Sequence, residues 1–238
     1  MKASILYLYY DFMNLYGDNG NVRIMEKRLQ DQGFDVEVVR KTITDEDISF
    51  EGFDFIYCGS GTESRRFAAV QHLKKFEAGL KIAAATGTPI LFTGNAWGML
   101  GNSITSLNGI KTDGLGFFGF DVKEEIKTRF TGDAIESSAD FNKSFVGFIN
   151  KCDVIEGFDG YTFKVAKTIG QIPYEADGVR KDNLFGISLI GPVLAKNPFF
   201  AEHIVKLIDE RRGVTYRDVR YPHEEQGYGM TLKALAEC

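Results

Sequence analysis

Apolar and polar positions alternate with two different periods over the first hundred residues. Short runs rich in apolar, β-branched and aromatic residues predict four strands, at residues 3–10, 34–40, 53–59 and 89–94. Between them, apolar residues recur every three or four positions and predict helices at residues 22–32 and 63–86. This order predicts βαβ units around a parallel sheet, hence an α/β fold with helices on both faces.

The pattern changes after Gly101, where strand-like segments follow one another with turns and without helices. We expect an antiparallel extension at the edge of the main sheet. A buried strand is predicted within residues 183–195, an amphipathic helix at residues 199–213, and a polar, peripheral tail at about residues 214–238. The 44% apolar composition is enough for one core, so residues 1–238 are expected to form a single domain.

Charge and composition exclude several classes of partner. The chain carries 28 basic and 33 acidic residues without a basic stripe, which argues against nucleic acid or an anionic bilayer as a partner. No segment has the features of a signal peptide or the roughly 20 apolar residues of a membrane helix, so a cytoplasmic protein without a membrane span is expected. Its three cysteines have no zinc-ligand spacing and are interpreted as reduced thiols.

Residues 88–100, TPILFTGNAWGML, have the outline of a nucleophile elbow. An apolar run stops at a turn of small residues, and a helix-like segment follows. No side chain in this stretch can attack a carbonyl. The segment is therefore either a catalytic turn that lacks its catalyst or an ordinary corner between a strand and a helix.

Several segments, in order along the chain, resemble class I glutamine amidotransferase domains of the cobyric-acid-synthase type. The similarity is greatest to the glutaminase subunits that work with a Mur-ligase-like subunit in lipid II isoglutaminyl synthases. The resemblance implies a flavodoxin-like class I glutamine amidotransferase fold and no cofactor. The matching segments are MNLYGDNGNV, FIYCGSGTESRR, PILFTGNAWGMLG, DGLGFFGF, TRFTGD, VGFIN and FGISLIGPVLAKNP.

In such enzymes an elbow cysteine attacks the glutamine amide, a histidine moves the proton and backbone N–H groups hold the oxyanion. The resemblance aligns Gly94 with the cysteine and Ile190 with the histidine, so neither catalytic side chain is retained. It implies that Arg129 contacts a substrate carboxylate. The oxyanion or ligand pocket that it implies consists of Gly59, Ser60, Gly61, Asn95 and Trp97.

Two cysteines and three histidines are the candidate replacements for the missing catalysts. Cys58 ends a predicted strand and Cys152 lies in a predicted loop, and both are interpreted as inert thiols rather than nucleophiles. Packing or surface roles are expected for the three histidines, His72, His203 and His223.

Two further motifs admit a functional and a structural interpretation. The GSGTESRR segment opens a helix and has the form of a weak anion-binding site. Arg65 and Arg66 either add positive charge to this site or lie on a solvated face of the helix, and we favour the solvated face. The YGDNGN segment, with Asp18, lacks calcium-loop spacing, so we expect a tight turn capped by Asn21 and no metal.

Three functions are compatible with the sequence, and we favour the first, in which glutaminase activity is absent. The first is a catalytically degenerate amidotransferase-like subunit that binds a Mur-ligase-like or other ATP-dependent synthetase in cell-wall precursor amidation. The second is a working glutaminase subunit that uses Cys58 or channels ammonia produced elsewhere. The third is a sensor in which the vacated pocket beside Asn95 and Trp97 binds an amino acid or an anion.

Overall fold

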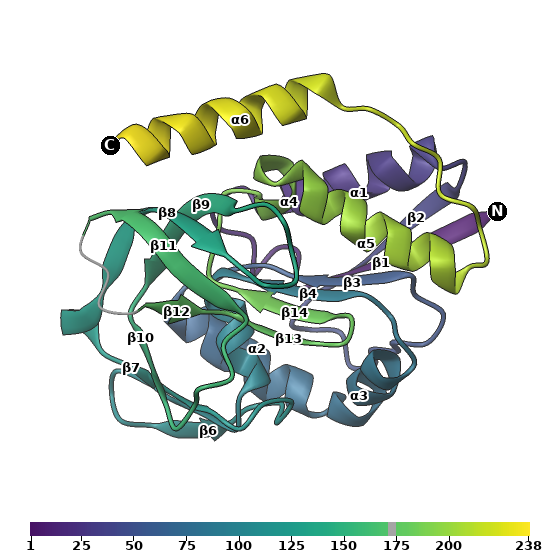
Figure 1. The fold of residues 1–238 in the computed structure, drawn as a ribbon. Coiled ribbons are helices and arrows are strands. Elements are labelled where there is room, and N and C mark those ends of the chain that lie inside the picture. The colour runs from purple at the N-terminus through teal and green to yellow at the C-terminus, as the bar shows by residue number, and fades with distance from the viewer. Residues whose placement is uncertain (171–174) are drawn as a thin grey trace.

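A computed structural model describes residues 1–170 and 175–238. Its central sheet has six strands, all parallel except β13. Their spatial order is that of flavodoxin-like folds, which confirms the predicted α/β class (Figure 1). In this order they are β13 (Val179–Lys181), β14 (Leu184–Ile187), β4 (Ile90–Thr93), β3 (Phe55–Cys58), β1 (Lys2–Leu8) and β2 (Asp35–Lys41).

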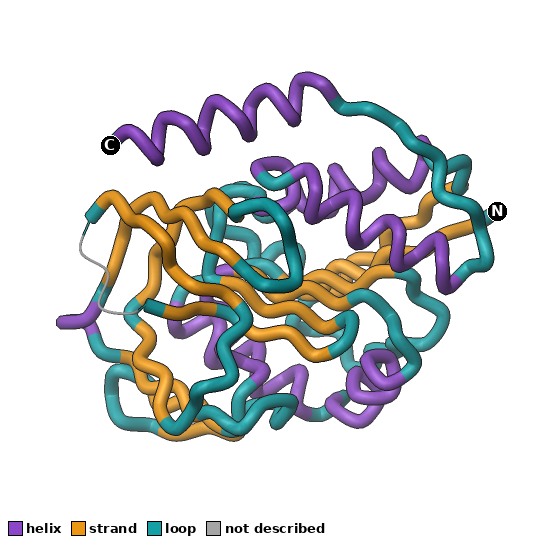
Figure 2. The backbone as a smooth tube through the Cα atoms, viewed as in Figure 1, coloured by secondary structure: helices purple, strands orange, loops and turns teal. Residues whose placement is uncertain are grey.

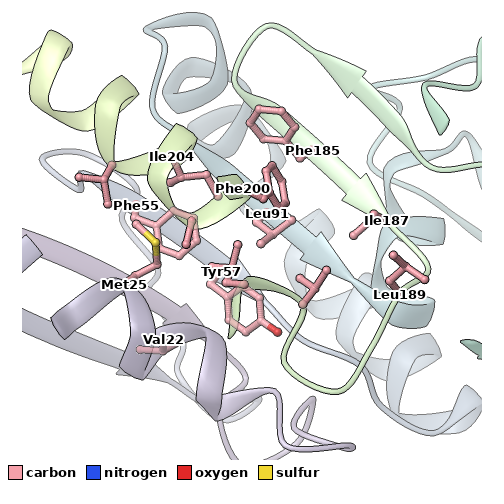
Figure 3. Close-up of a cluster of buried hydrophobic side chains, with 14 of the residues drawn as sticks. Val22, Met25, Phe55, Tyr57, Leu91, Phe185, Ile187, Leu189, Phe200 and Ile204 are labelled. Carbon is pink, nitrogen blue, oxygen red and sulfur yellow. The ribbon is translucent and has the colours of Figure 1, made fainter. Parts of the chain in front are cut away.

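Helices cover both faces of this sheet (Figures 1 and 2). Along β1, Ile5 and Tyr7 pack in the core formed with α1 and α5, whereas Leu6 and Leu8 pack in the core formed with α2 and α3. Figure 3 shows part of the first core. Because successive side chains point to opposite faces, both must be apolar, which explains the uninterrupted apolar strands. The helices are α1 (Asn19–Asp31), α2 (Glu63–Lys74), α3 (Glu77–Ala85), α4 (Val193–Lys196), α5 (Pro198–Arg211) and α6 (Pro222–Glu237).

The single long helix predicted at residues 63–86 is wrong, because the chain bends at Phe76 and forms α2 and α3 instead. Phe76 has a non-helical backbone conformation, with φ −112° and ψ 11°. Leu73 before the bend and Leu80 after it nevertheless belong to the same core. The apolar period continues across the bend, so the periodicity gave no sign of it.

The strands predicted after Gly101 are present, and an antiparallel strand of this half of the chain, β13, lies at the edge of the main sheet. The strands from Ser103 to Asp177 form two separate four-stranded sheets instead, and an isolated bridge between Phe148 and Ile190 joins one of these sheets to the segment after β14. The first consists of β10 (Asp153–Glu156), β7 (Asp121–Glu124), β5 (Ser103–Thr105) and β6 (Lys111–Asp113). The second consists of β12 (Ala176–Asp177), β11 (Phe163–Ile169), β8 (Phe130–Ser137) and β9 (Phe145–Lys151).

The C-terminal tail lies on the outside of the molecule but contains a helix that was not predicted, α6 (Figure 1). Only Leu235 of α6 is buried. The Arg28 guanidinium holds the tail by an ion pair with Glu224 at 2.5 Å and by stacking over the Tyr221 ring. Among the described residues, no helix is both long enough and apolar enough to cross a membrane. That the whole chain is one domain stays a prediction.

Candidate functional site

The elbow lies at the carboxyl end of β4, where α/β folds place their ligands. Gly94 follows the strand directly and opens a short 3₁₀-helix, η1 (Gly94–Leu100), in which every residue is buried. Its φ of +58° is in the left-handed region, which glycine enters at little cost. The sequence therefore has the backbone turn of an elbow with no side chain at its tip.

The space in front of Gly94 is filled by two neighbouring side chains. A β-carbon at position 94 would lie 2.5 Å from Ser60 Oγ and 2.7 Å from Ile190 Cγ2. Such contacts are far inside van der Waals range, so a side chain at this position requires its neighbours to move. The structure thus brings together three predicted positions, Gly94, Ser60 and Ile190, in a packed arrangement.

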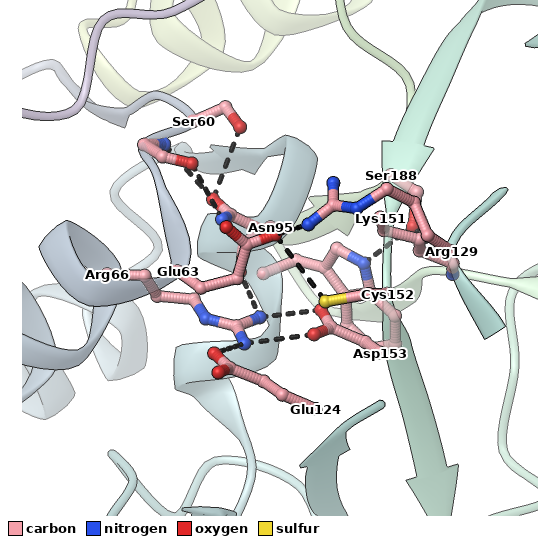
Figure 4. A network of polar contacts seen from close by, with 12 residues as sticks. Ser60, Glu63, Arg66, Asn95, Glu124, Arg129, Lys151, Cys152, Asp153 and Ser188 are labelled. Atoms are coloured by element: carbon pink, nitrogen blue, oxygen red, sulfur yellow. Dashed lines mark hydrogen bonds and ion pairs between the residues drawn. The ribbon is translucent and has the colours of Figure 1, made fainter. Parts of the chain in front are cut away.

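In the glycine-rich loop at residues 59–61, the amides of Ser60 and Gly61 donate to internal acceptors. One of these acceptors, Asn95, lies beside Ser60 in Figure 4. Ser60 N donates to Asp18 Oδ2 at 2.7 Å, and Gly61 N donates to Asn95 Oδ1 at 3.1 Å. Asn95 closes the pair by donating from Nδ2 to the Gly61 carbonyl at 2.8 Å. These amides belong to the predicted oxyanion loop, and here protein oxygens satisfy them.

Asp18, which belongs to the predicted tight turn, is completely buried beneath this loop. Its Oδ1 accepts from the Tyr57 hydroxyl at 3.1 Å and from Thr93 Oγ1 at 3.4 Å. Burial raises the pKa of the Asp18 carboxyl to about 7, against the lowering effect of the hydrogen bonds from Ser60, Tyr57 and Thr93. Asp18 therefore links the loop before α1 to the ends of β3 and β4.

The predicted cap by Asn21 is wrong, because Asn21 lies inside α1 and is buried. Its Nδ2 donates to the Tyr57 hydroxyl at 2.7 Å, and its Oδ1 accepts from Leu194 N at 2.9 Å. The side chain thus joins the β3 strand end to α4. Asp18 takes the N-cap position without a side-chain capping bond.

The expected solvated helix face is wrong for Arg66, which is fully buried behind the elbow (Figure 4). Its guanidinium donates to both carboxylate oxygens of Asp153, at 2.5 and 2.9 Å, and to Glu124 Oε1 at 2.5 Å. It also donates to the Asn95 carbonyl at 3.2 Å. The bidentate ion pair fixes α2 and the elbow to the sheet that contains β7 and β10. Arg65, by contrast, is exposed as expected.

A second buried polar cluster holds the other side of the elbow. The Trp97 indole donates to Ser188 Oγ at 2.8 Å, and Ser188 Oγ donates to Asp177 Oδ1 at 2.6 Å. Lys151 Nζ donates to the same two oxygens, at 3.0 and 2.9 Å. Trp97, predicted to border a pocket, is buried, and its hydrogen bond to Ser188 links η1 to the segment that follows β14.

A family profile for CobB/CobQ-like glutamine amidotransferase domains matches residues 4–198. The chain belongs to this family. Two relatives, each named as the GatD subunit of lipid II isoglutaminyl synthase (glutamine-hydrolyzing), match over most of their length. The Staphylococcus aureus (strain N315) protein is 28% identical over 233 residues, 94% of this chain and 92% of the relative. The Streptococcus pneumoniae (strain ATCC BAA-255 / R6) protein is 26% identical over 214 residues, 86% of this chain and 79% of the relative.

Solved structures agree on the fold of this amidotransferase family. PurLQS from Thermotoga maritima superimposes with a TM-score of 0.55 at 14% identity, covering 89% of this chain and 97% of that one. A glutamine amidotransferase from the same organism gives a TM-score of 0.53 at 13% identity, covering 100% and 97%. Within this family fold, the chain has glycine and isoleucine where the resemblance aligns the catalytic cysteine and histidine.

Arg129 lies beside the first turn of α2 and forms an ion pair with the Glu63 carboxylate (Figure 4). The resemblance to amidotransferases predicted that Arg129 contacts a substrate carboxylate. Arg129 also donates to Asn150 Oδ1 at 2.8 Å. The guanidinium thus has an internal carboxylate partner, and its predicted role in substrate binding stays a prediction.

Neither buried thiol has the environment of an activated nucleophile. Burial and the charge of Asp18 raise the pKa of Cys58, which is completely buried. Burial and the charges of Asp153 and Glu63 raise the pKa of Cys152 to about 12. Cys152 Sγ lies 3.4 Å from Glu63 Oε1.

The histidines have the packing and surface roles that were expected. His72 Nδ1 forms a hydrogen bond with the Tyr9 hydroxyl at 2.9 Å, and the His203 ring packs on Phe141. His223 is exposed on α6. In the described ranges, 1–170 and 175–238, no group of His, Cys, Asp and Glu side chains is arranged to hold a metal ion.

Proposed function

We propose that this chain is a glutamine amidotransferase-like subunit that does not hydrolyse glutamine and that pairs with a Mur-ligase-like or other ATP-dependent amide synthetase in cell-wall precursor amidation. The family membership and the relatives named as synthase subunits support the pairing. The absence of a nucleophile and a base at Gly94 and Ile190 supports the loss of hydrolysis.

The observation that carries the proposal is the packing at the elbow tip. Ser60 and Ile190 occupy the space into which a nucleophile at position 94 would project. The amides of Ser60 and Gly61 already have acceptors, in Asp18 and Asn95. Three requirements of amide hydrolysis are therefore unmet at the elbow: a nucleophile, the space for its side chain and free hydrogen-bond donors for an oxyanion.

The alternatives receive less support from the same geometry. A glutaminase that uses Cys58 requires a thiolate from a fully buried thiol whose pKa is raised. A sensor requires room beside Gly94, where the nearest side-chain atoms would lie 2.5 to 2.7 Å from a single added carbon. A subunit that contributes structure or regulation requires neither.

Glutamate release from glutamine tests the proposal, with the chain alone and with the purified Mur-ligase-like protein of the same organism. We expect no release above a protein-free blank, and no covalent adduct after treatment with a glutamine-directed electrophile. We also expect that Gly94→Cys and Gly94→Cys/Ile190→His remain inactive, because Ser60 still blocks the tip.

Glutamate release by the wild-type chain that disappears in Cys58→Ser or Cys152→Ser would favour the working glutaminase instead. Gly213→Cys is a matched control for the engineered thiol, since Gly213 also has a positive φ and has open space around it.

A further inference from the structure

Three ionisable side chains of the second small sheet are buried together beside the elbow. Lys151 lies on β9, Asp177 on β12 and Glu136 on β8. Lys151 Nζ donates to Asp177 Oδ1 at 2.9 Å. Taking charges out of water is costly, and a single lysine balances the charge of a single carboxylate. The cluster is therefore neutral when one of its two carboxyl groups is protonated.

Glu136 is the carboxyl group that keeps its proton. Burial raises the pKa of Glu136 well above its ordinary value, and the charge of Asp177 raises it further, against the lowering effect of the Lys151 charge. Among the described residues, no group donates a hydrogen bond to either carboxyl oxygen of Glu136. The protonated form can donate to Asp177. A buried acid thus lies next to the carboxylate that Lys151 contacts.

Asp177 is held in place by two donors of one residue. Ser188 N donates to its Oδ2 at 2.9 Å, and Ser188 Oγ donates to its Oδ1 at 2.6 Å. Burial opposes the charge of Asp177, but Lys151 and these hydrogen bonds keep its pKa below the ordinary value. The Ser188 amide is also placed to stabilise negative charge that develops on Oδ2.

Aromatic side chains lie around the cluster and limit access of water. Lys151 Nζ lies 5.5 Å from the centre of the buried Trp97 ring. Glu136 pairs with Phe145 across β8 and β9, and Asp177 pairs with Phe163 across β12 and β11. Directly opposed residues have neighbouring side chains, and both rings are buried. In such surroundings an uncharged group in place of an ion pair avoids the cost of two buried charges.

We propose that Lys151 and Asp177 condense to an internal isopeptide bond, with Glu136 as the proton carrier. One proton passes from Lys151 Nζ to Asp177 Oδ1, and the free electron pair of Nζ forms a bond to Cγ of Asp177. Glu136 then gives its proton to Oδ1, the bond between Cγ and Oδ1 breaks, and water leaves. Glu136 recovers a proton from Nζ. An ammonium and a carboxylate thus become one amide and one water molecule, and no other reactant is needed.

The intact mass of the purified full chain tests this bond. We expect the wild-type chain to be lighter by one water molecule than the same sequence without a cross-link, and its digest to contain one branched peptide that joins Lys151 to Asp177. Lys151→Met and Glu136→Gln should lose no water. Asp177→Asn should lose one ammonia molecule instead, because the side-chain nitrogen becomes the leaving group. Lys206→Met is the matched control and should still lose water, since Lys206 forms an exposed ion pair with Glu202.

The wild-type mass decides the proposal even if a variant does not fold. A wild-type chain that keeps its full mass after long incubation at neutral pH would overturn the bond. Loss of water from Lys151→Met would place the dehydration elsewhere in the chain and overturn it as well. Loss of water from a folded Glu136→Gln would refute the role of Glu136. The cross-link is separate from glutamine hydrolysis, so these outcomes leave the proposed function intact.

Discussion

Replacing Gly94 by alanine probes the blocked elbow directly. The added β-carbon meets Ser60 Oγ at 2.5 Å, Ser60 Cβ at 2.6 Å and Ile190 Cγ2 at 2.7 Å. Overpacking of a well-packed core costs about 1–3 kcal/mol. The positive φ of 58° adds about 1–2 kcal/mol for a residue with a β-carbon. We therefore expect Gly94→Ala to lower the free energy of unfolding by about 2–5 kcal/mol.

Gly213→Ala separates these two contributions. Gly213 has a φ of +63°, close to that of Gly94, but no atom lies within 4 Å of a β-carbon built there. Gly213→Ala should therefore lower the free energy of unfolding only by the cost of the backbone conformation, about 1–2 kcal/mol. The entropy that alanine removes from the unfolded chain is similar at both positions and cancels in the comparison.

Equilibrium unfolding in urea gives both free energies if the transitions are two-state. A double-mutant cycle with Ser60→Gly adds a second check, because that change removes two of the three close contacts at Gly94. Gly94→Ala should then cost at least about 1 kcal/mol less in the Ser60→Gly background. If Gly94→Ala costs no more than Gly213→Ala, the elbow tip is open and the account of a blocked site is wrong.

Three other outcomes are expected. Because its folded pKa is raised to about 7 from 3.8, Asp18 favours the folded state below pH 4 and loses that contribution as the pH rises through 7. The free energy of unfolding of the wild-type chain should therefore fall relative to Asp18→Asn over this range, and parallel pH profiles would contradict the assignment. Arg66→Met should lower the free energy of unfolding by about 3–5 kcal/mol, because it leaves the buried Asp153 carboxylate unpaired, and a loss under about 1 kcal/mol in urea unfolding would contradict the burial. Iodoacetamide at neutral pH should label the exposed Cys238 rapidly and the buried Cys58 only on unfolding, as peptide mass spectrometry would show; equal rates would contradict their environments.

The order of strands and helices in the central sheet followed from local patterns because the inner strands β1, β3, β4 and β14 are apolar on both faces. Ile5 and Tyr7 face one core and Leu6 and Leu8 the other, so the uninterrupted run already encodes a covered parallel strand. The α6 helix left no comparable signal, since it buries only Leu235.

The elbow was visible in the sequence because it depends on neighbours along the chain, whereas its surroundings depend on distant ones. Arg66 meets Glu124 and Asp153 at separations of 58 and 87 residues, and Asp18 meets the Ser60 amide at a separation of 42. A charged residue on a helix is usually solvated, so nothing local predicts a buried ion pair. The same limit hid the packing of Ser60 and Ile190 against Gly94.

The most direct test of the proposed loss of hydrolysis uses glutamine with an isotopically labelled side-chain amide. The substrate is given to the purified chain together with the proposed Mur-ligase-like synthetase, and the labelled ammonium and labelled amide product are measured by mass spectrometry. A non-hydrolytic subunit predicts no label in either pool, with any amidation depending on added ammonium. Label in the ammonium or in the product would contradict the proposal.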